Sequence, residues 1–411
     1  MRFLYTIGIY IAEFLVKLIA PFNQKLKLGV EGRAKTFEIL KSSIQKEDKT
    51  FWFHCASLGE YEQGLPVFME LRKLHPHHKI ILTFFSPSGY EIRKNTDVAD
   101  IVAYLPMDTK ANAKLFLDLI HPELTVFVKY DIWPNYLFEL KKRQVKAILI
   151  SALFRKNQTY FKWYGGIMQE ALSSFEHIFV QDDTSHQLLN SINFTNTSVA
   201  GDTRFDRVYN QLDQDNQLSF IEEFKGASLC VVIGSSWPED LDLLVPFING
   251  NSSENVKYII APHNIKSKEI SELVSELKVD TVRFSEMKGK KVSDYNVFVL
   301  DTIGLLTKVY SYADIAYVGG AMGTSGLHNI LEPAVFGAPV IIGKNYQKFP
   351  EAKRMIEKAG VRSISNYQEL ETILSEWIHN DYKRKYLGEM NINFITRNKG
   401  AVVQILNHLR I

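Results

Sequence analysis

The sequence predicts an α/β protein made of two doubly wound, Rossmann-like domains, and three features of the chain lead to this prediction. Near-continuous apolar runs of strand length alternate with segments of helical spacing, which is typical of parallel sheets covered on both faces. A polar, glycine-free segment at residues 209–223 separates two such series. With 411 residues, the chain is long enough for about two domains.

The first series of apolar runs begins with FWFHCA at Phe51. Further strands are expected at residues 79–85, 101–105, 123–128, 145–150 and 177–180. In a doubly wound sheet, ligands bind beyond the carboxyl ends of the strands. The polar residues that follow these runs are therefore the candidate site of the first domain.

Glu60 stands at the turn from the first strand into a helix expected from about residue 61. A carboxylate in this position can accept a proton from a hydroxyl group. It can equally serve only as a first-turn acid that complements the helix dipole, so the residue pattern leaves both roles open. Leu65 and Pro66 occupy the positions where a Walker phosphate-binding loop needs Lys and Ser or Thr, which excludes that loop type.

Two polar clusters follow later strands of this series. Lys129 and Asp131 come just before Trp-Pro-Asn at residues 133–135, and Arg155 lies in a cluster at residues 151–156. Each cluster starts where an apolar run stops. We therefore expect both to open onto the same crevice as Glu60.

Arg204 lies in the polar segment 201–206 and has two interpretations. It can pair with Asp202 or Asp206 on either side, which would make it structural. It can also be offered to an anionic substrate, a role that suits the fixed fork of its guanidinium group.

The second series is organised around a glycine-rich loop. Strands are expected from residue 229 and at 256–261, 279–284, 296–300, 314–318 and 338–342. Between the last two lie Gly319, Gly320, Gly323 and Gly326, followed by Asn329-Ile330-Leu331-Glu332. Asn329 and Glu332 have the spacing of a helix start in which the two side chains cap the backbone.

This loop predicts a nucleotide site. Glycines let the backbone approach a ligand closely, and free N–H groups at a helix start attract anions. Glu332 is placed to accept from the hydroxyls of a ribose. A capping pair without a ligand is the alternative.

Three further segments, each at the end of an expected strand, are expected to line the crevice of the second domain with their backbone. They are Ser235 in GSS, Pro262-His263 and Ile303-Gly304-Leu305. Asp240 and Asp242 form a DxD sequence that binds metal in some glycosyltransferases, but acids in a first helical turn have the dipole as a sufficient reason. No other His, Cys or Asp cluster has ligand spacing, so no metal is predicted.

Residues 1–22 are almost wholly apolar, with Glu13 and Lys17 on one narrow face of the expected helix. Two internal charges make a full membrane span costly, whereas nearby basic residues suit an anionic lipid surface. We expect membrane association, with a buried first helix as the alternative. The net charge of +2 argues against a nucleic-acid partner, and Cys55 and Cys230 are expected to be buried, reduced thiols.

Several motifs occur together and in a fixed order along nearly the whole chain. They are Ser57-Leu-Gly-Glu60, Ile132-Trp-Pro-Asn135, residues 201–206, Asp301-Thr-Ile-Gly304 and the segment from Val318 to Pro333. This set resembles the 3-deoxy-D-manno-octulosonic acid (Kdo) transferases of lipopolysaccharide synthesis. The resemblance implies a GT-B architecture, in which two Rossmann-like domains face a central cleft.

The resemblance also implies site residues. Glu60 matches the general base that would deprotonate the acceptor hydroxyl, and Asp131 and Arg204 match positions that stabilise the transition state. The segments that match those holding cytidine monophosphate (CMP) are Pro262-His263, Ile303-Gly304-Leu305 and Asn329-Ile330-Leu331-Glu332. Further donor or acceptor contacts are expected from Ser235, Gly320, Lys129 and Arg155.

The implied reaction transfers Kdo from CMP-Kdo to the lipid A precursor with inversion. No metal and no cofactor are expected, because the leaving group carries a single phosphate. The expected location is the cytoplasmic face of the bacterial inner membrane. The implied division is a membrane-associating helix at 1–22, an acceptor-binding domain at 23–208, a linker at 209–223, a CMP-sugar-binding domain at 224–390 and a C-terminal helix at 391–411 that can pack back on the first domain.

Three positions depart from the family pattern. His263 replaces the usual Arg, Leu305 replaces the usual Glu, and Lys129 replaces an acid. The alternatives are another GT-B enzyme, a transferase or epimerase that uses a UDP-sugar, and an inactive membrane-bound scaffold. The first would share the glycine loop, and the second would have lost the acid at position 60.

Overall fold

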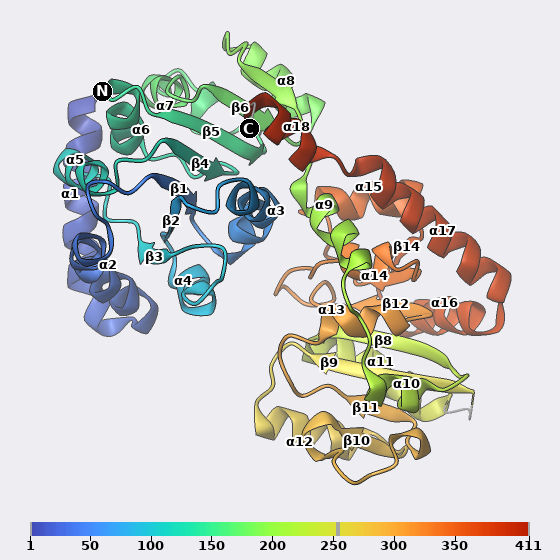
Figure 1. The fold of residues 1–411 in the computed structure, drawn as a ribbon. Coiled ribbons are helices and arrows are strands. Elements are labelled where there is room, and N and C mark those ends of the chain that lie inside the picture. Colours follow the sequence, from blue (N-terminus) through green and yellow to red (C-terminus); the bar gives the residue numbers. More distant parts are fainter. Residues whose placement is uncertain (1, 252–254, 410–411) are drawn as a thin grey trace. The chain divides into compact units, whose positions relative to one another are not determined.

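The computed structural model describes residues 2–251 and 255–409, which form two compact units. Unit 1 comprises Met1–Arg207 and Lys399–Ile411, and unit 2 comprises Val208–Asn398 (Figure 1). Met1, the first residue of the expected membrane helix, and Arg410 and Ile411, the last of the expected C-terminal helix, lie outside the described residues.

Unit 1 is built on a seven-stranded parallel sheet with the order β3-β2-β1-β4-β5-β6-β7. The strands are β1 Thr50–Cys55, β2 Lys79–Phe84, β3 Ile101–Tyr104, β4 Leu124–Val128, β5 Lys146–Ala152, β6 His177–Val180 and β7 Thr197–Val199. The expected strands of this domain are confirmed to within one or two residues. The sequence analysis missed β7, because its three residues include Thr and Ser and form no apolar run.

Helices cover both faces of this sheet. They are α1 Arg2–Ile19, α2 Gln24–Ser43, α3 Leu58–Leu74, α4 Pro87–Arg93, α5 Lys110–Ile120, α6 Pro134–Lys142, α7 Gly166–Leu172, α8 Asp183–Asn190, α9 Thr203–Tyr209 and α18 Ala401–Leu409. Successive residues of β1 point to opposite faces. Trp52 therefore packs in one core with Phe116 of α5, whereas Phe53 packs in the other with Phe68 of α3.

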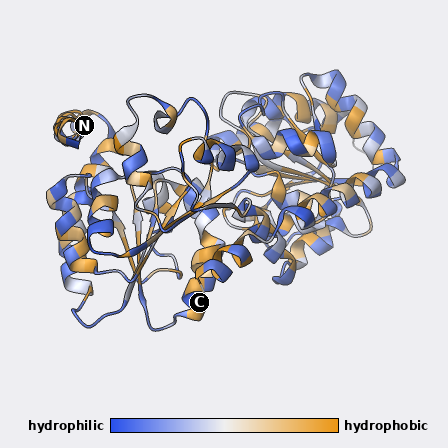
Figure 2. Cartoon of the chain, turned by 90° about the horizontal axis from the view of Figure 1, so that it is seen from above, coloured by the Kyte–Doolittle hydropathy of each residue, from blue (hydrophilic) through white to orange (hydrophobic). Residues whose placement is uncertain are grey.

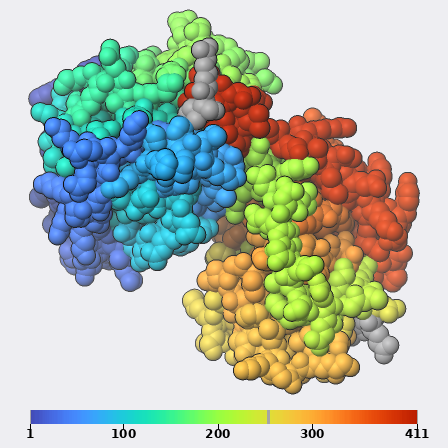
Figure 3. Space-filling model, in the orientation of Figure 1, coloured from blue at the N-terminus to red at the C-terminus, as the bar shows by residue number. Residues whose placement is uncertain are grey.

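The C-terminal segment belongs to unit 1. Ala401, Ile405 and Leu409 of α18 are buried in the same core as Phe68, and Figure 3 shows this segment, in red, against unit 1. The Asp206 carboxylate accepts hydrogen bonds from the backbone N–H groups of Gly400 (2.9 Å) and Ala401 (3.1 Å). The returning segment is shorter than the expected 391–411, because α17 (Asp381–Asn398) lies in unit 2.

Helix α1 exposes its apolar side. None of its residues is buried, and Phe3, Phe14 and Leu18 are 74%, 66% and 59% exposed. Glu13 and Lys17 pair at 2.7 Å and line a cavity of about 220 Å³ against α2, where the Glu13 side chain is 23% exposed and that of Lys17 61% exposed. Residues Arg2–Phe22 are long and apolar enough to cross a membrane, and Figure 2 shows the helix beside the N-terminus as largely hydrophobic.

Unit 2 contains a second parallel sheet with the order β10-β11-β9-β8-β12-β13-β14. Its strands are β8 Leu229–Ser236, β9 Val256–Pro262, β10 Thr281–Arg283, β11 Val297–Val299, β12 Ile315–Val318, β13 Val340–Ile342 and β14 Val361–Ser363. Its other helices are α10 Ser219–Lys225, α11 Pro238–Gly250, α12 Ser267–Glu276, α13 Leu306–Val309, α14 Leu331–Val335, α15 Pro350–Lys358 and α16 Tyr367–His379. Both cysteines are buried and free.

The expected linker at 209–223 is largely ordered. It contains a 3-10 helix at Asn210–Asp213 and most of α10, whose Ile221 and Phe224 are buried. The unit boundary lies between Arg207 and Val208, inside α9. Sequence polarity was misleading here because a short amphipathic helix needs only two buried apolar side chains.

Candidate functional site

Both sheets have a point where the strand order reverses, and the candidate residues lie at these two points. In unit 1, β1 lies between β2 and β4, so the helices after β1 and β4 leave toward different faces. Glu60 follows β1 and Asp131 follows β4. In an open α/β sheet the crevice at such a point is where ligands bind.

Glu60 occupies the first turn of α3 and is only 7% exposed. The backbone N–H of Ser57 donates to its Oε2 at 3.0 Å. Burial, with a smaller effect of Asp131, raises the pKa of Glu60 to about 7, although Lys129 and backbone hydrogen bonds oppose the shift. Glu60 therefore caps the start of α3, which is the structural interpretation, and its role as a proton acceptor stays a prediction.

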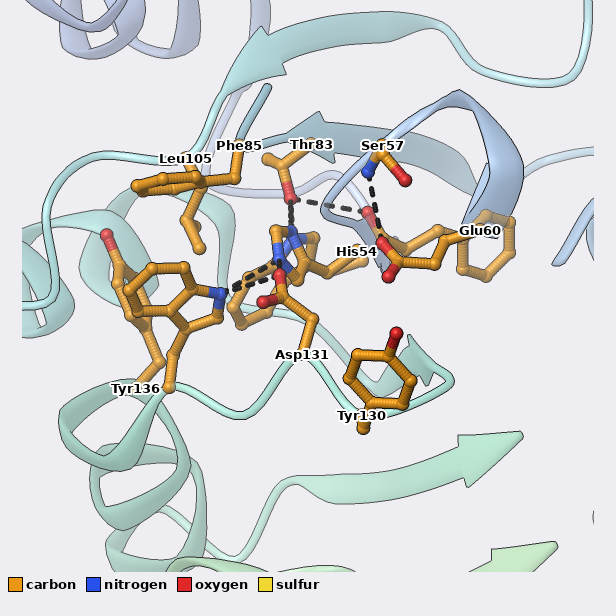
Figure 4. Close-up of polar contacts among 12 residues, drawn as sticks. His54, Ser57, Glu60, Thr83, Phe85, Leu105, Tyr130, Asp131 and Tyr136 are labelled. Atoms are coloured by element: carbon orange, nitrogen blue, oxygen red, sulfur yellow. Dashed lines mark hydrogen bonds and ion pairs between the residues drawn. The ribbon is translucent and has the colours of Figure 1, made fainter. Parts of the chain in front are cut away.

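Asp131 is held by a buried network that the sequence analysis did not identify (Figure 4). Its Oδ2 lies 2.6 Å from Nε2 of His54, which has no exposed surface, and accepts from the indole N–H of Trp133 at 2.9 Å. The other ring nitrogen of His54 lies 2.8 Å from Oγ1 of Thr83. Trp52 donates its indole N–H to the same Oγ1 at 2.8 Å.

These partners assign the His54 proton. The Asp131 carboxylate only accepts, so Nε2 of His54 carries a hydrogen. The Thr83 hydroxyl accepts from Trp52, and it lies 2.8 Å from Nδ1 of His54 and 3.4 Å from the carbonyl oxygen of Phe53. The indole nitrogen of Trp133 lies 3.1 Å from Nε2 of His54. A histidine inside an otherwise apolar strand was the sequence signal that could have revealed this network.

Arg204 is paired with Asp202. Its Nε and terminal nitrogen donate to Asp202 Oδ2 at 3.0 and 2.7 Å. Burial alone would raise the pKa of Asp202, but Arg204, with a smaller effect of Lys129, holds it below its usual value. Lys129 thus acts electrostatically on Asp202 and on Glu60, which places the three candidates Glu60, Asp131 and Arg204 at one edge of the sheet.

The two further candidates of unit 1, Lys129 and Arg155, have different surroundings. Lys129 directly follows β4 and has a left-handed backbone with φ of 69°, and its ammonium lies 5.3 Å from the centre of the Tyr130 ring. Arg155 is exposed, and its backbone N–H is bonded to the Gln158 side chain at 2.8 Å. No contact that the structure describes joins Arg155 to Glu60.

In unit 2 the reversal point lies between β8 and β12. Ser235, near the end of β8, has a left-handed φ of 53°, and Gly320, after β12, has φ of 94°. Asp240 joins the two sides, because its Oδ2 accepts from the backbone N–H groups of Trp237 (2.9 Å) and Gly320 (2.8 Å). This aspartate, the first of the DxD pair, therefore fixes the glycine loop.

The Asn329–Glu332 pair differs from the expected cap. Helix α14 begins at Leu331 and not at Asn329. The Asn329 side chain accepts from the Leu331 N–H at 3.2 Å and donates to Glu332 Oε1 at 3.1 Å. The other carboxylate oxygen accepts from the Thr307 hydroxyl at 3.3 Å, so Glu332 is joined to the segment that follows Leu305.

His263 belongs to an aromatic group at the same edge. Its ring stacks on Trp237 at 4.3 Å between centroids and lies 4.7 Å from the His328 ring. Burial lowers the pKa of His263, and burial with the neighbouring His263 lowers that of His328 to about 4. These rings are neutral at pH 7 and offer a flat surface.

The remaining expected contacts lie close by in the chain. Pro262 is the last residue of β9 and precedes His263. Ile303 is 83% exposed, and Gly304 has a left-handed φ of 96°. Ile330 and Leu331 are buried in the core, so only their backbone can face a ligand. Among residues 2–251 and 255–409, no group of three or more His, Cys, Asp or Glu side chains is arranged to hold a metal ion.

Comparison with known proteins finds similarity to one family of transferases. Residues 31–207 match the family model described as 3-deoxy-D-manno-octulosonic-acid transferase. A 3-deoxy-D-manno-octulosonic acid transferase of Haemophilus influenzae is 25% identical over 100% of this chain and 98% of its own length. One from Aquifex aeolicus is 27% identical over 83% of this chain and 90% of its own length.

Solved structures show the same two-domain fold at low identity. A UDP-GlcNAc 2-epimerase from Neisseria meningitidis aligns with a TM-score of 0.61 and 14% identity, over 88% of this chain and 99% of that one. MurG from Acinetobacter baumannii aligns with a TM-score of 0.55 and 11% identity, over 88% of this chain and 99% of that one. The expected GT-B class is confirmed by the two parallel sheets and by these neighbours.

Proposed function

Because this chain belongs with the 3-deoxy-D-manno-octulosonic-acid (Kdo) transferases among the glycosyltransferases, we propose that it moves Kdo from CMP-Kdo to a lipid A precursor. Glu60 is the general base. It takes the proton of an acceptor hydroxyl while the hydroxyl oxygen bonds to the ketosidic carbon. The bond from that carbon to the phosphate of CMP breaks, and the configuration inverts.

The single observation that carries this mechanism is the pKa of Glu60, raised to about 7 at the reversal point of the first sheet. A base is most effective when its pKa is close to the working pH. An ordinary first-turn glutamate would remain ionised but be a weak base. Burial and the nearby Asp131 carboxylate raise the pKa of Glu60 above that of such an ordinary glutamate.

Asp131 and Arg204 act on charge that develops during transfer. The Arg204 guanidinium, held flat against Asp202, is suited to the carboxylate of the donor or to the departing phosphate. Asp131, kept in place by His54 and Trp133, balances positive charge on the reacting carbon.

The CMP moiety binds unit 2 along the residues already described. Glu332 accepts from ribose hydroxyls, and the rings of Trp237 and His263 support the base by stacking. Backbone at Ser235 and Gly320 approaches the phosphate. A monophosphate leaving group carries little charge, so the reaction proceeds without a metal ion and without a cofactor.

The acceptor is a membrane lipid, and α1 brings the enzyme to it. The exposed apolar side of α1 inserts into the lipid surface of the inner membrane on its cytoplasmic side. Two charges in the second half of α1, Glu13 and Lys17, make a full membrane span costly, so the helix lies along the surface.

The test is release of CMP from CMP-Kdo in the presence of a tetraacylated lipid A precursor, with the product followed by mass. Glu60→Gln should lower the rate by about a hundredfold or more. Glu70→Gln is the matched control, because Glu70 is on the same helix and pairs only with the exposed Lys73. Equal rates for wild type and Glu60→Gln would remove the base assignment, and no release by the wild type would remove the proposed reaction.

A further inference from the structure

A second cavity of about 580 Å³ lies in unit 1 between α1, α5, α6 and α7. Its lining contains five basic residues and two acids, with Asn135 and Phe138 between them. The basic residues are Arg2, Lys110, Lys114, Lys141 and Lys142. The formal charge around the cavity is therefore +5 − 2 = +3.

Both acids of the cavity are already engaged. Glu170 accepts from Arg2, and Glu139 pairs with Arg143 at 2.9 Å and Lys142 at 3.8 Å. In the part of the chain that the structure describes, Lys110 and Lys114 have no acidic partner within ion-pair distance. Lys141 donates to Ser173 and to no described carboxylate, so the uncompensated charge lies on α5 and at the end of α6.

The positions of these two lysines do not favour helix stability. Lys110 is the first residue of α5 and Lys114 lies one turn later, and the first turn contains no acid. Positive charge at a helix start opposes the macrodipole, and like charges four residues apart repel. By contrast, Lys141 and Lys142 end α6, where the dipole favours them. Lys110 and Lys114 are therefore best explained by an anionic ligand.

The walls of the cavity are fixed by a buried aspartate. Asp108 accepts from the Tyr5 hydroxyl of α1 at 2.7 Å and from the backbone N–H groups of Asn135 and Tyr136 at 3.1 Å each. It ties the membrane-facing helix to the start of α6. Asn135, in the first turn of α6, lines the cavity and follows Asp131 by four residues in the chain.

We infer that this cavity binds a phosphate monoester carried by the lipid acceptor. This rests on the proposed function and names a part of its substrate. A monoester carries more than one negative charge and three terminal oxygens, which several ammonium groups can share, whereas the diester of an ordinary phospholipid carries one charge. Arg2 at the start of α1 places the cavity at the edge of the apolar surface, where lipid headgroups lie.

The test compares binding of the full-length protein to phosphatidylcholine vesicles that contain phosphatidic acid, a monoester, or phosphatidylglycerol, a diester, at equal surface potential. Wild type should prefer the monoester by about tenfold, the factor that one charge-assisted contact contributes. Lys110→Gln/Lys114→Gln should abolish this preference. Glutamine forms helices well, so α5 is retained.

The matched control is Lys35→Gln/Lys41→Gln, which removes the same charge from exposed positions of α2. It should keep the monoester preference. An equal loss of the monoester preference in both double variants would overturn the inference, because it would mean that any basic surface of the protein attracts the vesicles. Displacement of the vesicles by inorganic phosphate at the same concentration as a short-chain phosphatidic acid would also overturn it, because the site would then serve a soluble anion.

Kinetics give an independent readout. In Lys110→Gln/Lys114→Gln, KM for a phosphorylated acceptor should rise about tenfold with kcat and the donor KM unchanged. An unchanged acceptor KM would overturn the inference while the transferase assignment stands. If the wild type transfers no Kdo, the proposed function fails, and the vesicle comparison still decides whether the cavity recognises a phosphate monoester.

Discussion

The Nε2 atom of His54 lies 2.6 Å from Oδ2 of Asp131, so a histidine with no exposed surface directs its proton at a carboxylate of the candidate site. The opposite ring nitrogen is fixed by Thr83, which is fixed in turn by Trp52. A strand of the first sheet thereby sets the orientation of a side chain on a loop after another strand.

This contact predicts that His54 positions Asp131. His54→Phe keeps an apolar ring of similar size but removes both hydrogen bonds, so kcat should fall by about a hundredfold, the effect of a small misplacement in an active site. His54→Gln keeps a donor near the position of Nε2 and should recover part of this loss. Steady-state rates with the melting temperature of each variant would check it, and equal rates for the two variants would contradict it.

The pH dependence of the reaction follows from the causes that act on Glu60. A general base works deprotonated, and the pKa of Glu60 is raised to about 7, so kcat/KM should rise with pH and level off above about 7. Asp131→Asn removes a charge that raises this pKa and should move the acidic limb to lower pH. Lys129→Gln removes a charge that lowers it and should move the limb to higher pH. Shifts in the same direction would exclude Glu60 as the titrating group.

The glycine loop of unit 2 should not accept a side chain at Gly320. Its φ is 94°, and a Cβ there would lie 2.1 Å from the carbonyl oxygen of Gly326. Gly320→Ala should destabilise the protein by about 1–3 kcal/mol and raise the donor KM. Gly250→Ala, at a position where a Cβ meets nothing within 4 Å, is the control. Denaturant unfolding and donor titration would measure both effects.

Docking of α18 depends on Asp206. Because its carboxylate accepts from Gly400 and Ala401, Asp206→Ala should cost about 1 kcal/mol of unfolding free energy, the value of a helix cap. Asp97→Ala, at an exposed position, should have no comparable effect. Chemical denaturation would measure the difference, and equal stabilities would show that apolar packing alone holds the helix.

The two sheets and the candidate residues at their edges could be predicted from local patterns. A buried parallel strand has to be apolar along its whole length, so β1, β4, β8 and β12 are visible in the sequence. The glycine-rich loop after β12 and the acid Glu60 after β1 are also visible in a short stretch of sequence. The short strands β7 and β14 have too few residues to form such a pattern.

Partners that lie far apart in the chain were decided by tertiary structure alone. The sequence determined the fold class, the apolar character of α1 and the positions of Glu60 and Glu332, because these depend on neighbouring residues. Only the folded chain brings His54 to Asp131, Asp240 to Gly320, and Lys110 and Lys114 to Arg2. The physical reason is that hydrogen bonds, burial and charge act through space, and strand order in a sheet is not a local property.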